Sequence, residues 1–383
     1  MKIAYFTDTF LPQINGVTNT LGYLSAYLTS KDVEHIFIAP DYDEEPSEHP
    51  DYPVVRFRGI KPLIYPECRL VFPPHARIID ILIAFQPDVV HIVTELGIGY
   101  AGLRAARELQ LPVIMSYHTN YDQYLDFYNL SYLSRPVWSY VRWFHQFAAI
   151  TLCPSRATAD ALRCHGIRHT DIWSRGIDRG VFSPAHADKT LLAEFGLQDM
   201  TVFLYVGRIA KEKGLDTLAE SIKTLSQAQL ATMAFVFTGD GPYLEELKAL
   251  GIPNAVFTGC LRGDALAKVY ASCDVFVFPS GTETFGNVFL EAMASGLPGI
   301  CVDAGGVTDF TEHGENAYVC RYRDAEDLAA ALTAMTDETL RNHLRAGALK
   351  TAQARDWPVI LDGLMRHYDH VLKESLYRCN VAV

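Results

Sequence analysis

The chain has 383 residues, of which 49% are hydrophobic, and it contains no low-complexity segment. This length and composition predict two or three ordinary globular domains and exclude a largely disordered protein. With 45 acidic and 33 basic residues, the net charge of −12 argues against a nucleic-acid-binding protein.

The first half of the chain alternates short apolar segments with helix-forming segments. The apolar segments have the length of β-strands and lie at residues 2–6, 35–40, 53–57, 88–93, 112–118 and 148–153. Segments with helical character lie between them, at 20–30, 76–85 and 100–109. This alternation predicts a doubly wound α/β domain with a parallel sheet.

A second series of apolar segments predicts a second parallel sheet. These segments lie at 201–207, 233–241, 254–259, 274–279 and 299–303. Residues 182–198, with a proline, an aspartate and a glycine, are predicted as a linker. We expect one domain over 1–182, a second over 183–356, and an amphipathic helix within 357–383 that packs back on the first. Ligands of such sheets bind where the carboxyl ends of the strands meet.

The N-terminal segment MKIAYFTD has the pattern of a strand and lacks the features of a signal peptide. The longest apolar runs are shorter than the roughly 18 residues of a membrane span. The eight cysteines occur singly and are typical of reduced core residues, not of a disulfide framework or a zinc site. We therefore expect a cytoplasmic protein.

The most informative segment, residues 274–302, holds two glutamates eight positions apart across a predicted strand-to-helix turn. Glu283 falls in the loop after the strand, and Glu291 falls about one turn into the helix, for which Asn287 is the expected cap. The N–H groups of Phe285, Gly286 and Asn287 are open there, and such groups bind anions and sugar hydroxyls. Glu283 suits a hexose and Glu291 a ribose. Alternatively, both glutamates are solvated surface residues.

Loops after strands of the first sheet add two candidates. Gly16 stands just before a helix that Thr18 or Asn19 would cap, and a glycine there lets a phosphate approach backbone N–H groups. His118 ends another strand and is followed by a loop rich in tyrosine, asparagine and aspartate, a composition suited to carbohydrate. The alternatives are an ordinary turn glycine and a buried, hydrogen-bonded histidine.

Two basic residues follow the first strand of the second sheet. Lys213 lies five positions after Arg208. Two fixed cations at a strand end can hold a diphosphate, whereas the alternative is a solvated charge cluster. Gly241, in the GDGP turn at 239–242, follows the next strand and is expected at the same edge; the alternative is a plain turn.

The segment GIGYAG at 97–102 matches the dinucleotide-binding pattern G-x-G-x-x-G. That pattern also requires an acidic residue about 20 positions later, at the end of the following strand. Here the following strand ends in His118. We therefore predict that this segment does not bind a dinucleotide.

Taken together, these segments resemble the family 4 retaining glycosyltransferases with the GT-B fold. The resemblance spans nearly the whole chain and rests on TDTFLPQINGV, SYHTNYDQY, RGID, GRIAKEKG, GDGP and ETFGNVFLE. It implies two facing doubly wound Rossmann-like domains with a deep interdomain cleft, and a C-terminal helix that crosses back to the N-terminal domain. Within the family, the segments are most similar to lipid and glycolipid mannosyltransferases and to sulfoquinovosyl-diacylglycerol synthases.

The resemblance implies that the N-terminal domain binds the acceptor and the C-terminal domain the nucleotide-sugar donor. The residues that it implies in catalysis are His118, Arg208, Lys213 and Glu283. Those that it implies in donor binding are Gly16, Arg208, Lys213, Gly241, Glu283, Phe285, Gly286, Asn287 and Glu291. Those expected to bind the acceptor are Asp8, Tyr121 and Gln123.

Among these roles, Arg208 and Lys213 would neutralise the departing diphosphate, and His118 would contact the sugar near the reacting carbon. No metal ion or other cofactor is expected, because the two cations would do the work of Mg²⁺. Asp309 stands where many family members have a glutamate, so it is not included in the site.

We therefore predict a metal-independent, retaining hexosyltransferase that moves a hexosyl group from a UDP- or GDP-sugar to an acceptor hydroxyl. The acceptor is a glycolipid or a soluble compound such as a glycoside or an aminocyclitol. Two other functions stay as alternatives: a nucleotide-sugar epimerase and a non-catalytic sugar-nucleotide-binding module.

Residues 135–150 combine arginines with Trp138, Trp143 and Phe144. A segment of this kind can rest on a membrane surface, which would place the protein at the inner face of the membrane. The same spacing also suits a helix that packs on a core. The sequence leaves both alternatives open, together with the oligomeric state.

Overall fold

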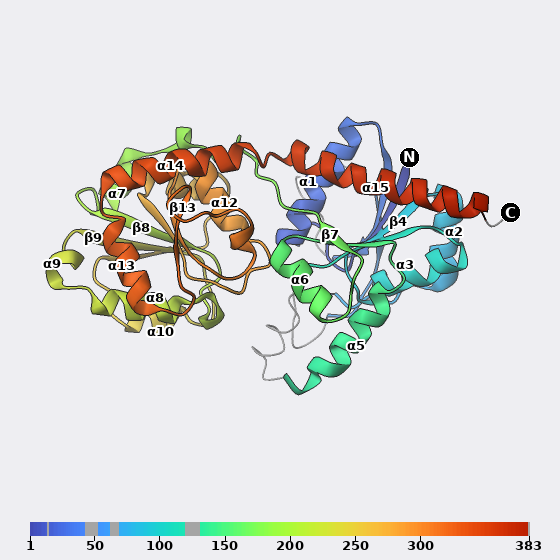
Figure 1. The fold of residues 1–383 in the computed structure, drawn as a ribbon, viewed down its shortest axis with the longest axis horizontal. Helices are drawn as coiled ribbons and strands as arrows, with labels where there is room; N and C mark the ends of the chain where they lie inside the picture. The colour runs from blue at the N-terminus through green and yellow to red at the C-terminus, as the bar shows by residue number, and fades with distance from the viewer. Residues whose placement is uncertain (14, 43–52, 62–68, 119–130, 382–383) are drawn as a thin grey trace. The chain divides into compact units, whose positions relative to one another are not determined.

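The computed structural model describes residues 1–13, 15–42, 53–61, 69–118 and 131–381. The chain forms two compact units, here called the N-unit (Met1–Ser174 with Pro358–Val383) and the C-unit (Arg175–Trp357). Each unit is an α/β fold with one parallel sheet (Figure 1). The predicted cleft between the two units stays a prediction.

The described strands of the N-unit form a seven-stranded parallel sheet in the order β3-β2-β1-β4-β5-β6-β7. Their bounds are β1 (Lys2–Phe6), β2 (Glu34–Pro40), β3 (Val54–Phe57), β4 (Val89–Ile92), β5 (Val113–Ser116), β6 (Ile150–Cys153) and β7 (Thr170–Ile172). The central strands are buried on both faces, which explains why they read as continuous apolar runs. Ile3 of β1 is in register with Val89 of β4.

The described helices of the N-unit are α1 (Gly16–Ser30), α2 (His75–Phe85), α3 (Gly97–Glu108), α5 (Ser134–His145), α6 (Arg156–Cys164) and α15 (Trp357–Val381). The first residue of α15 belongs to the C-unit. A 3₁₀ turn, η1 (Ser131–Leu133), precedes α5. The predicted cap of α1 was wrong. Asn15 caps the helix, because its side chain accepts from the N–H groups of Val17 and Thr18 while the Thr18 hydroxyl accepts from the Asn15 N–H. Gly16 is therefore the first helical residue.

The predicted C-terminal helix packs on the N-unit as α15, beside α1 (Figure 1). The Tyr368 hydroxyl lies 2.9 Å from the Tyr5 hydroxyl and 2.6 Å from Nδ1 of His91, and all three side chains are buried. Nε2 of His91 lies 2.7 Å from the Ser116 hydroxyl. Burial lowers the pKa of His91 to about 3, so the imidazole is neutral and acts as one donor and one acceptor.

The described strands of the C-unit form a six-stranded parallel sheet in the order β10-β9-β8-β11-β12-β13. Their bounds are β8 (Thr201–Val206), β9 (Met233–Thr238), β10 (Ala255–Gly259), β11 (Val275–Phe278), β12 (Gly299–Val302) and β13 (Ala317–Cys320). The helices are α7 (Lys189–Glu194), α8 (Leu215–Thr224), α9 (Gln227–Leu230), α10 (Leu244–Ala249), α11 (Gly263–Ser272), α12 (Asn287–Ala294), α13 (Ala325–Ala334) and α14 (Glu338–Gln353). The 3₁₀ turns are η2 (Pro184–His186), η3 (Lys211–Lys213) and η4 (Gly306–Asp309).

The segment predicted as a linker, residues 182–198, carries η2 and α7. Phe182 and Leu191 pack against the core of the C-unit, so the segment belongs to that unit. The linker was predicted from the proline, aspartate and glycine of this segment. That prediction did not take into account the hydrophobic side chains between them, which pack on the core.

The strand order of each sheet reverses at one place, between β1 and β4 in the N-unit and between β8 and β11 in the C-unit. At such a reversal the loops after the two strands leave toward opposite faces and open a crevice in which α/β proteins bind ligands. The loop after β8 carries Arg208 and Lys213, and the loop after β11 carries Glu283. In the described part of the chain, no helix combines the length and the apolar character that a membrane span needs.

The buried tyrosine–histidine network predicts the effect of removing one hydroxyl group. Tyr368→Phe leaves His91 and Tyr5 without that partner, so we expect a loss of about 1 to 3 kcal/mol of stability and a lower midpoint of thermal unfolding. Tyr377→Phe, on the same helix but 73% exposed, is the control and is expected to leave the midpoint unchanged. Equal midpoints for the two variants would contradict a role of the network in anchoring α15.

Candidate active site

The turn between β11 and α12 holds the most concentrated set of candidate residues. Gly286 caps α12 with φ 99° and ψ 52°, a left-handed conformation, and no side chain caps the helix. The prediction that Asn287 is the cap was therefore wrong, since Asn287 is the first helical residue. A Cβ atom on Gly286 would only reach ordinary contact, 3.6 Å from Phe278 and Val307. The backbone conformation, and not crowding, is what requires glycine there.

The turn is held in place from the side by Gly305 and Gly306. The Gly306 N–H donates to the Glu283 carbonyl at 2.8 Å, and a Cβ on Gly306 would lie 2.2 Å from the Thr284 carbonyl oxygen. Phe285 is buried and stacks on Phe310 with ring centroids 4.9 Å apart. The loop is thus fixed by packing on both sides.

The start of α12 leaves polar groups available to a ligand. The first-turn N–H groups of an α-helix have no acceptor within the helix and form an electropositive end. Beside them, Oδ1 of Asn287 is buried and has no hydrogen-bond partner. An unsatisfied buried acceptor is unusual in a folded protein and is commonly explained by a ligand or a water molecule.

Lys213 and Glu283 meet across the crevice. Nζ of Lys213 lies 2.6 Å from Oε1 of Glu283, and both side chains are largely shielded from solvent. Gly214, with φ 73°, presses the η3 turn against β11, since a Cβ there would lie 2.4 Å from the Pro279 carbonyl oxygen. The sequence placed each residue in a loop after a strand of the second sheet. The structure shows that the two strands, β8 and β11, are neighbours, and it brings the two charges together.

Arg208 lies at the same edge. Its Nη1 atom is 3.9 Å from Oε1 of Glu212, and its carbonyl oxygen accepts a hydrogen bond from the Tyr205 hydroxyl at 2.8 Å. Oε2 of Glu212 is buried without a hydrogen-bond partner. The GDGP turn packs closely on this loop, because a Cβ on Gly241 would lie 2.3 Å from the Ile209 carbonyl oxygen. The structure thus brings Arg208, Lys213 and Gly241 to one edge, as the sequence predicted.

Glu291 is partly buried, and its carboxylate contacts α11. Its Oε2 accepts a hydrogen bond from the Tyr270 hydroxyl at 3.0 Å. Burial raises the pKa of the Glu291 carboxyl to about 7, an effect that the Tyr270 hydrogen bond partly offsets. The alternative of a solvated helix residue is therefore wrong. Tyr270 lies on α11, and no local pattern connects it with Glu291.

Asp8 lies at the corresponding edge of the N-unit. Its carboxylate accepts from the Thr94 hydroxyl at 2.7 Å and from the Ile98 N–H at 2.8 Å, and burial raises its pKa. It occupies the N-terminus of α3, where the diphosphate of a dinucleotide would otherwise sit. The glycines of GIGYAG serve packing instead, since a Cβ on Gly99 would lie 1.8 Å from the Thr94 carbonyl oxygen.

Of the other candidates of the N-unit, His118 follows the end of β5 and Gly16 stands at the start of α1. The His118 ring packs edge-on against Trp173, with centroids 5.8 Å apart. Gly16 begins α1 behind the Asn15 cap. Tyr121 and Gln123 lie outside the described residues. Within the described ranges, no group of three or more His, Cys, Asp or Glu side chains is placed to hold a metal ion.

Two family models match the chain. The model described as Glycosyltransferase Family 4 matches residues 14–180, and the model described as Glycosyl transferases group 1 matches residues 200–338. These ranges lie mainly in the N-unit and in the C-unit, respectively.

Several characterised proteins are similar to the chain over most of its length. A GDP-mannose-dependent alpha-mannosyltransferase of Mycolicibacterium smegmatis is 34% identical and covers 97% of this chain and 98% of its own. A sulfoquinovosyl transferase of Arabidopsis thaliana is 33% identical, over 93% and 71%. An alpha-monoglucosyldiacylglycerol synthase of Streptococcus pneumoniae is 31% identical, over 78% and 70%.

The fold has a counterpart among solved structures. Anabaena HepE, determined in complex with UDP and glucose, superimposes with a TM-score of 0.76 at 20% identity, covering 97% of this chain and 100% of its own. With relatives above 30% identity across both units and family models on each, the chain belongs to the family 4 glycosyltransferases with the GT-B fold.

Proposed function

We propose that the enzyme transfers a hexosyl group from a nucleoside diphosphate sugar to a hydroxyl of a glycolipid, with retention of configuration and without a metal ion. The observation that carries the proposal is the set of Lys213, Glu283 and Asn287 around the N-terminus of α12. It offers a cation, a carboxylate, an unpartnered amide oxygen and helix N–H groups at one crevice.

The two cations match the charge of the donor. A diphosphate linked to a nucleoside and a sugar carries two negative charges, and Arg208 with Lys213 supplies two positive ones. The ion pair between Lys213 and Glu283 would have to open as the donor binds, because the diphosphate competes for Nζ. Glu283 would then accept hydroxyl groups of the sugar, for which carboxylate oxygens are good acceptors.

The chemical step needs no enzymic nucleophile. The acceptor oxygen forms a bond to the anomeric carbon on the face from which the diphosphate oxygen departs, which retains the configuration. The acceptor's proton passes to an oxygen of the leaving diphosphate. The contribution of the protein is to stabilise the charge that develops on that diphosphate, which Arg208 and Lys213 would do in place of a metal ion.

GDP-mannose is the donor and a glycolipid the acceptor that we propose to test first. The mannosyltransferase relative is named for GDP-mannose, and the Streptococcus relative is named as a diacylglycerol glycoside synthase. The test is transfer from GDP-mannose, UDP-glucose and ADP-glucose to glycosyl diacylglycerol acceptors and to soluble glycosides, with and without EDTA. The proposal requires an EDTA-insensitive lipid product with the donor's anomeric configuration; an inverted product or a strict need for metal would overturn it.

Lys213→Ala tests the assignment of the leaving-group cation. We expect the fold to persist and transfer to fall by about 10², because one charge-assisted contact to the leaving group is worth ~3 kcal/mol. Lys211→Ala is a matched control, since Lys211 is exposed and pairs with Glu246. A Lys213→Ala enzyme that turns over like the control would remove Lys213 from the mechanism.

Asn287→Ala separates ligand binding from stability. Because Oδ1 of Asn287 has no partner in the protein, its loss is expected to leave the unfolding midpoint unchanged or raised. We expect calorimetric affinity for the nucleoside diphosphate sugar to fall by about tenfold, the equivalent of one hydrogen bond. Unchanged affinity would mean that the amide oxygen does not face the donor.

The pKa of Glu291 predicts a pH dependence of donor binding. The carboxyl is protonated below a pKa of about 7, and only the ionised form accepts two ribose hydroxyls well. Affinity should therefore rise as pH increases, by roughly tenfold between pH 6 and pH 8. A nucleotide sugar is the right probe, because its diphosphate does not titrate in this range. Glu291→Gln should bind weakly at both pH values; a variant that keeps the pH dependence would exclude Glu291 as its source.

A further inference from the structure

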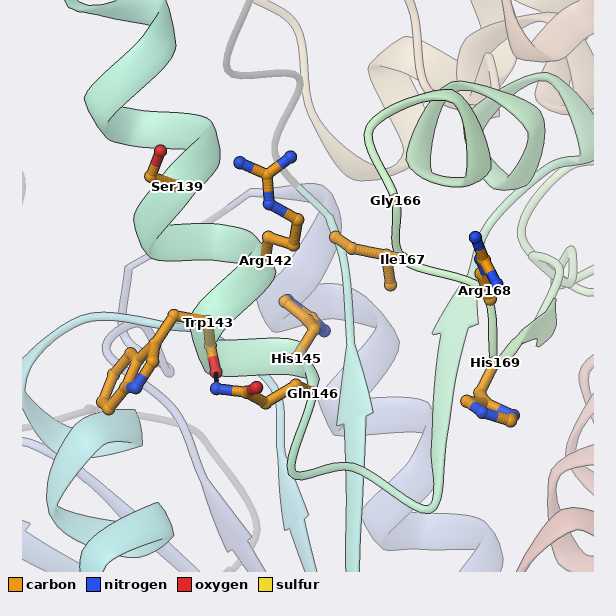
Figure 2. Close-up of a pocket in the computed structure, with 9 residues that line it drawn as sticks. All are labelled: Ser139, Arg142, Trp143, His145, Gln146, Gly166, Ile167, Arg168 and His169. Atoms are coloured by element: carbon orange, nitrogen blue, oxygen red, sulfur yellow. Dashed lines mark hydrogen bonds between the residues drawn. The ribbon is translucent and has the colours of Figure 1, made fainter.

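A pocket of about 560 Å³ lies in the N-unit between α5 and the segment that joins α6 to β7 (Figure 2). Its lining residues are Ser139, Arg142, Trp143, His145, Gln146, Gly166, Ile167, Arg168 and His169. The pocket lies beside the first residues of β6 and β7, whereas the candidate acceptor residue Asp8 follows the carboxyl end of β1. It is therefore separate from the sugar-transfer residues described above.

The pocket is basic within an acidic protein of net charge −12. Arg142 and Arg168 line it from its two sides, and no aspartate or glutamate is among its lining residues. In the described ranges neither arginine forms an ion pair; Nη1 of Arg142 donates only to the His165 carbonyl, at 3.3 Å. The buried Glu95 carboxylate is engaged by Nε2 of His145, at 3.2 Å. The two guanidinium charges are thus not neutralised by the protein.

The local backbone keeps the two sides of the pocket close together. Gly166 has φ 90°, and a Cβ there would lie 3.2 Å from Cδ of Arg142. The pocket also presents polar side chains, because Ser139 stands on α5, Gln146 follows the end of that helix and His169 stands opposite (Figure 2). Guanidinium groups form paired hydrogen bonds with phosphate oxygens, so the chemistry favours a phosphate group.

An exposed aromatic cluster adjoins the pocket on α5 and α3. Tyr100, Tyr140 and Trp143 are 44%, 37% and 40% exposed. The Trp143 ring lies 6.3 Å from that of Tyr100 and 5.9 Å from that of Tyr140, measured between centroids. Partly exposed tyrosine and tryptophan side chains are typical of proteins that sit at the depth of lipid headgroups.

We infer that this pocket binds the phosphate of an anionic phospholipid headgroup while Tyr100, Tyr140 and Trp143 rest on the lipid surface. An acidic chain is not drawn to an anionic membrane by its overall charge, so binding depends on a local basic site of this kind. The site needs no donor and uses no residue of the C-unit. It extends the proposed function, because it would hold the N-unit at the surface that contains a glycolipid acceptor.

The experiment is flotation of the full-length protein with vesicles of phosphatidylcholine, alone or with phosphatidylglycerol added. We expect binding that requires phosphatidylglycerol. Arg142→Gln with Arg168→Gln should weaken it by roughly 25-fold, since each arginine near an anionic surface contributes about fivefold. Arg163→Gln is the matched control, because Arg163 is nearby but pairs with Asp160 at 2.9 Å. It should bind as the unmodified protein does.

Three outcomes would overturn the inference. Equal binding to both kinds of vesicle would show that an anionic lipid is not required. Equal weakening of binding by the Arg163→Gln control would show that binding depends on general surface charge and not on the pocket. Calorimetric binding of inorganic phosphate without vesicle binding would show a free-anion site. Nucleotide-sugar affinity, measured on the same double variant, should be unchanged; it tests the donor site independently and also reports that the variant is folded.

Discussion

The candidate site exists because two buried parallel strands, β8 and β11, lie side by side while their following helices leave toward opposite faces of the sheet. The side chains of α8 belong to one hydrophobic core of the C-unit and those of α12 to the other. The loops between strand and helix therefore diverge. The crevice between them is lined by backbone and by polar side chains that belong to neither hydrophobic core.

Within that crevice the protein keeps opposite charges in contact. Lys213 and Glu283 orient each other at 2.6 Å, so neither cation nor carboxylate is left isolated in a partly desolvated place. A ligand with both anionic and hydroxyl groups can satisfy the two partners separately. Under the proposed function, the pair would therefore favour a molecule that carries both kinds of group over a simple anion or a simple sugar.

The arrangement along the chain could be predicted from the sequence, because strand-to-helix turns have local signatures. The placement of Arg208, Lys213 and Glu283 in loops after strands follows from the order of apolar segments, but the adjacency of β8 and β11 does not. The hydrogen bond from Tyr270 to Glu291 could not be predicted, since it joins two helices whose packing depends on the whole unit. The same holds for Asp8, which meets Ile98 only because β1 and β4 are neighbours.

The helix caps show a second limit on what can be predicted from the sequence. Asn15 and Thr18 form a reciprocal cap. Other polar residues nearby could also cap a helix, and which of them does so depends on the path of the preceding loop. At α12 the left-handed conformation of Gly286 moves the start of the helix by one residue. Glycine at this position is compatible with several turn types, so composition could not decide among them.

The contact of Tyr368 with Tyr5 also affects the order in which the two units can fold during synthesis. The N-unit is discontinuous, with its last helix encoded after the entire C-unit. Tyr5 and His91 are synthesised early but lack their partner until α15 emerges. The C-unit, which is continuous, can close its core before the last helix of the N-unit has been synthesised. Completion of the N-unit therefore requires a contact between residues 363 positions apart in the chain, formed only after the whole C-unit has been synthesised.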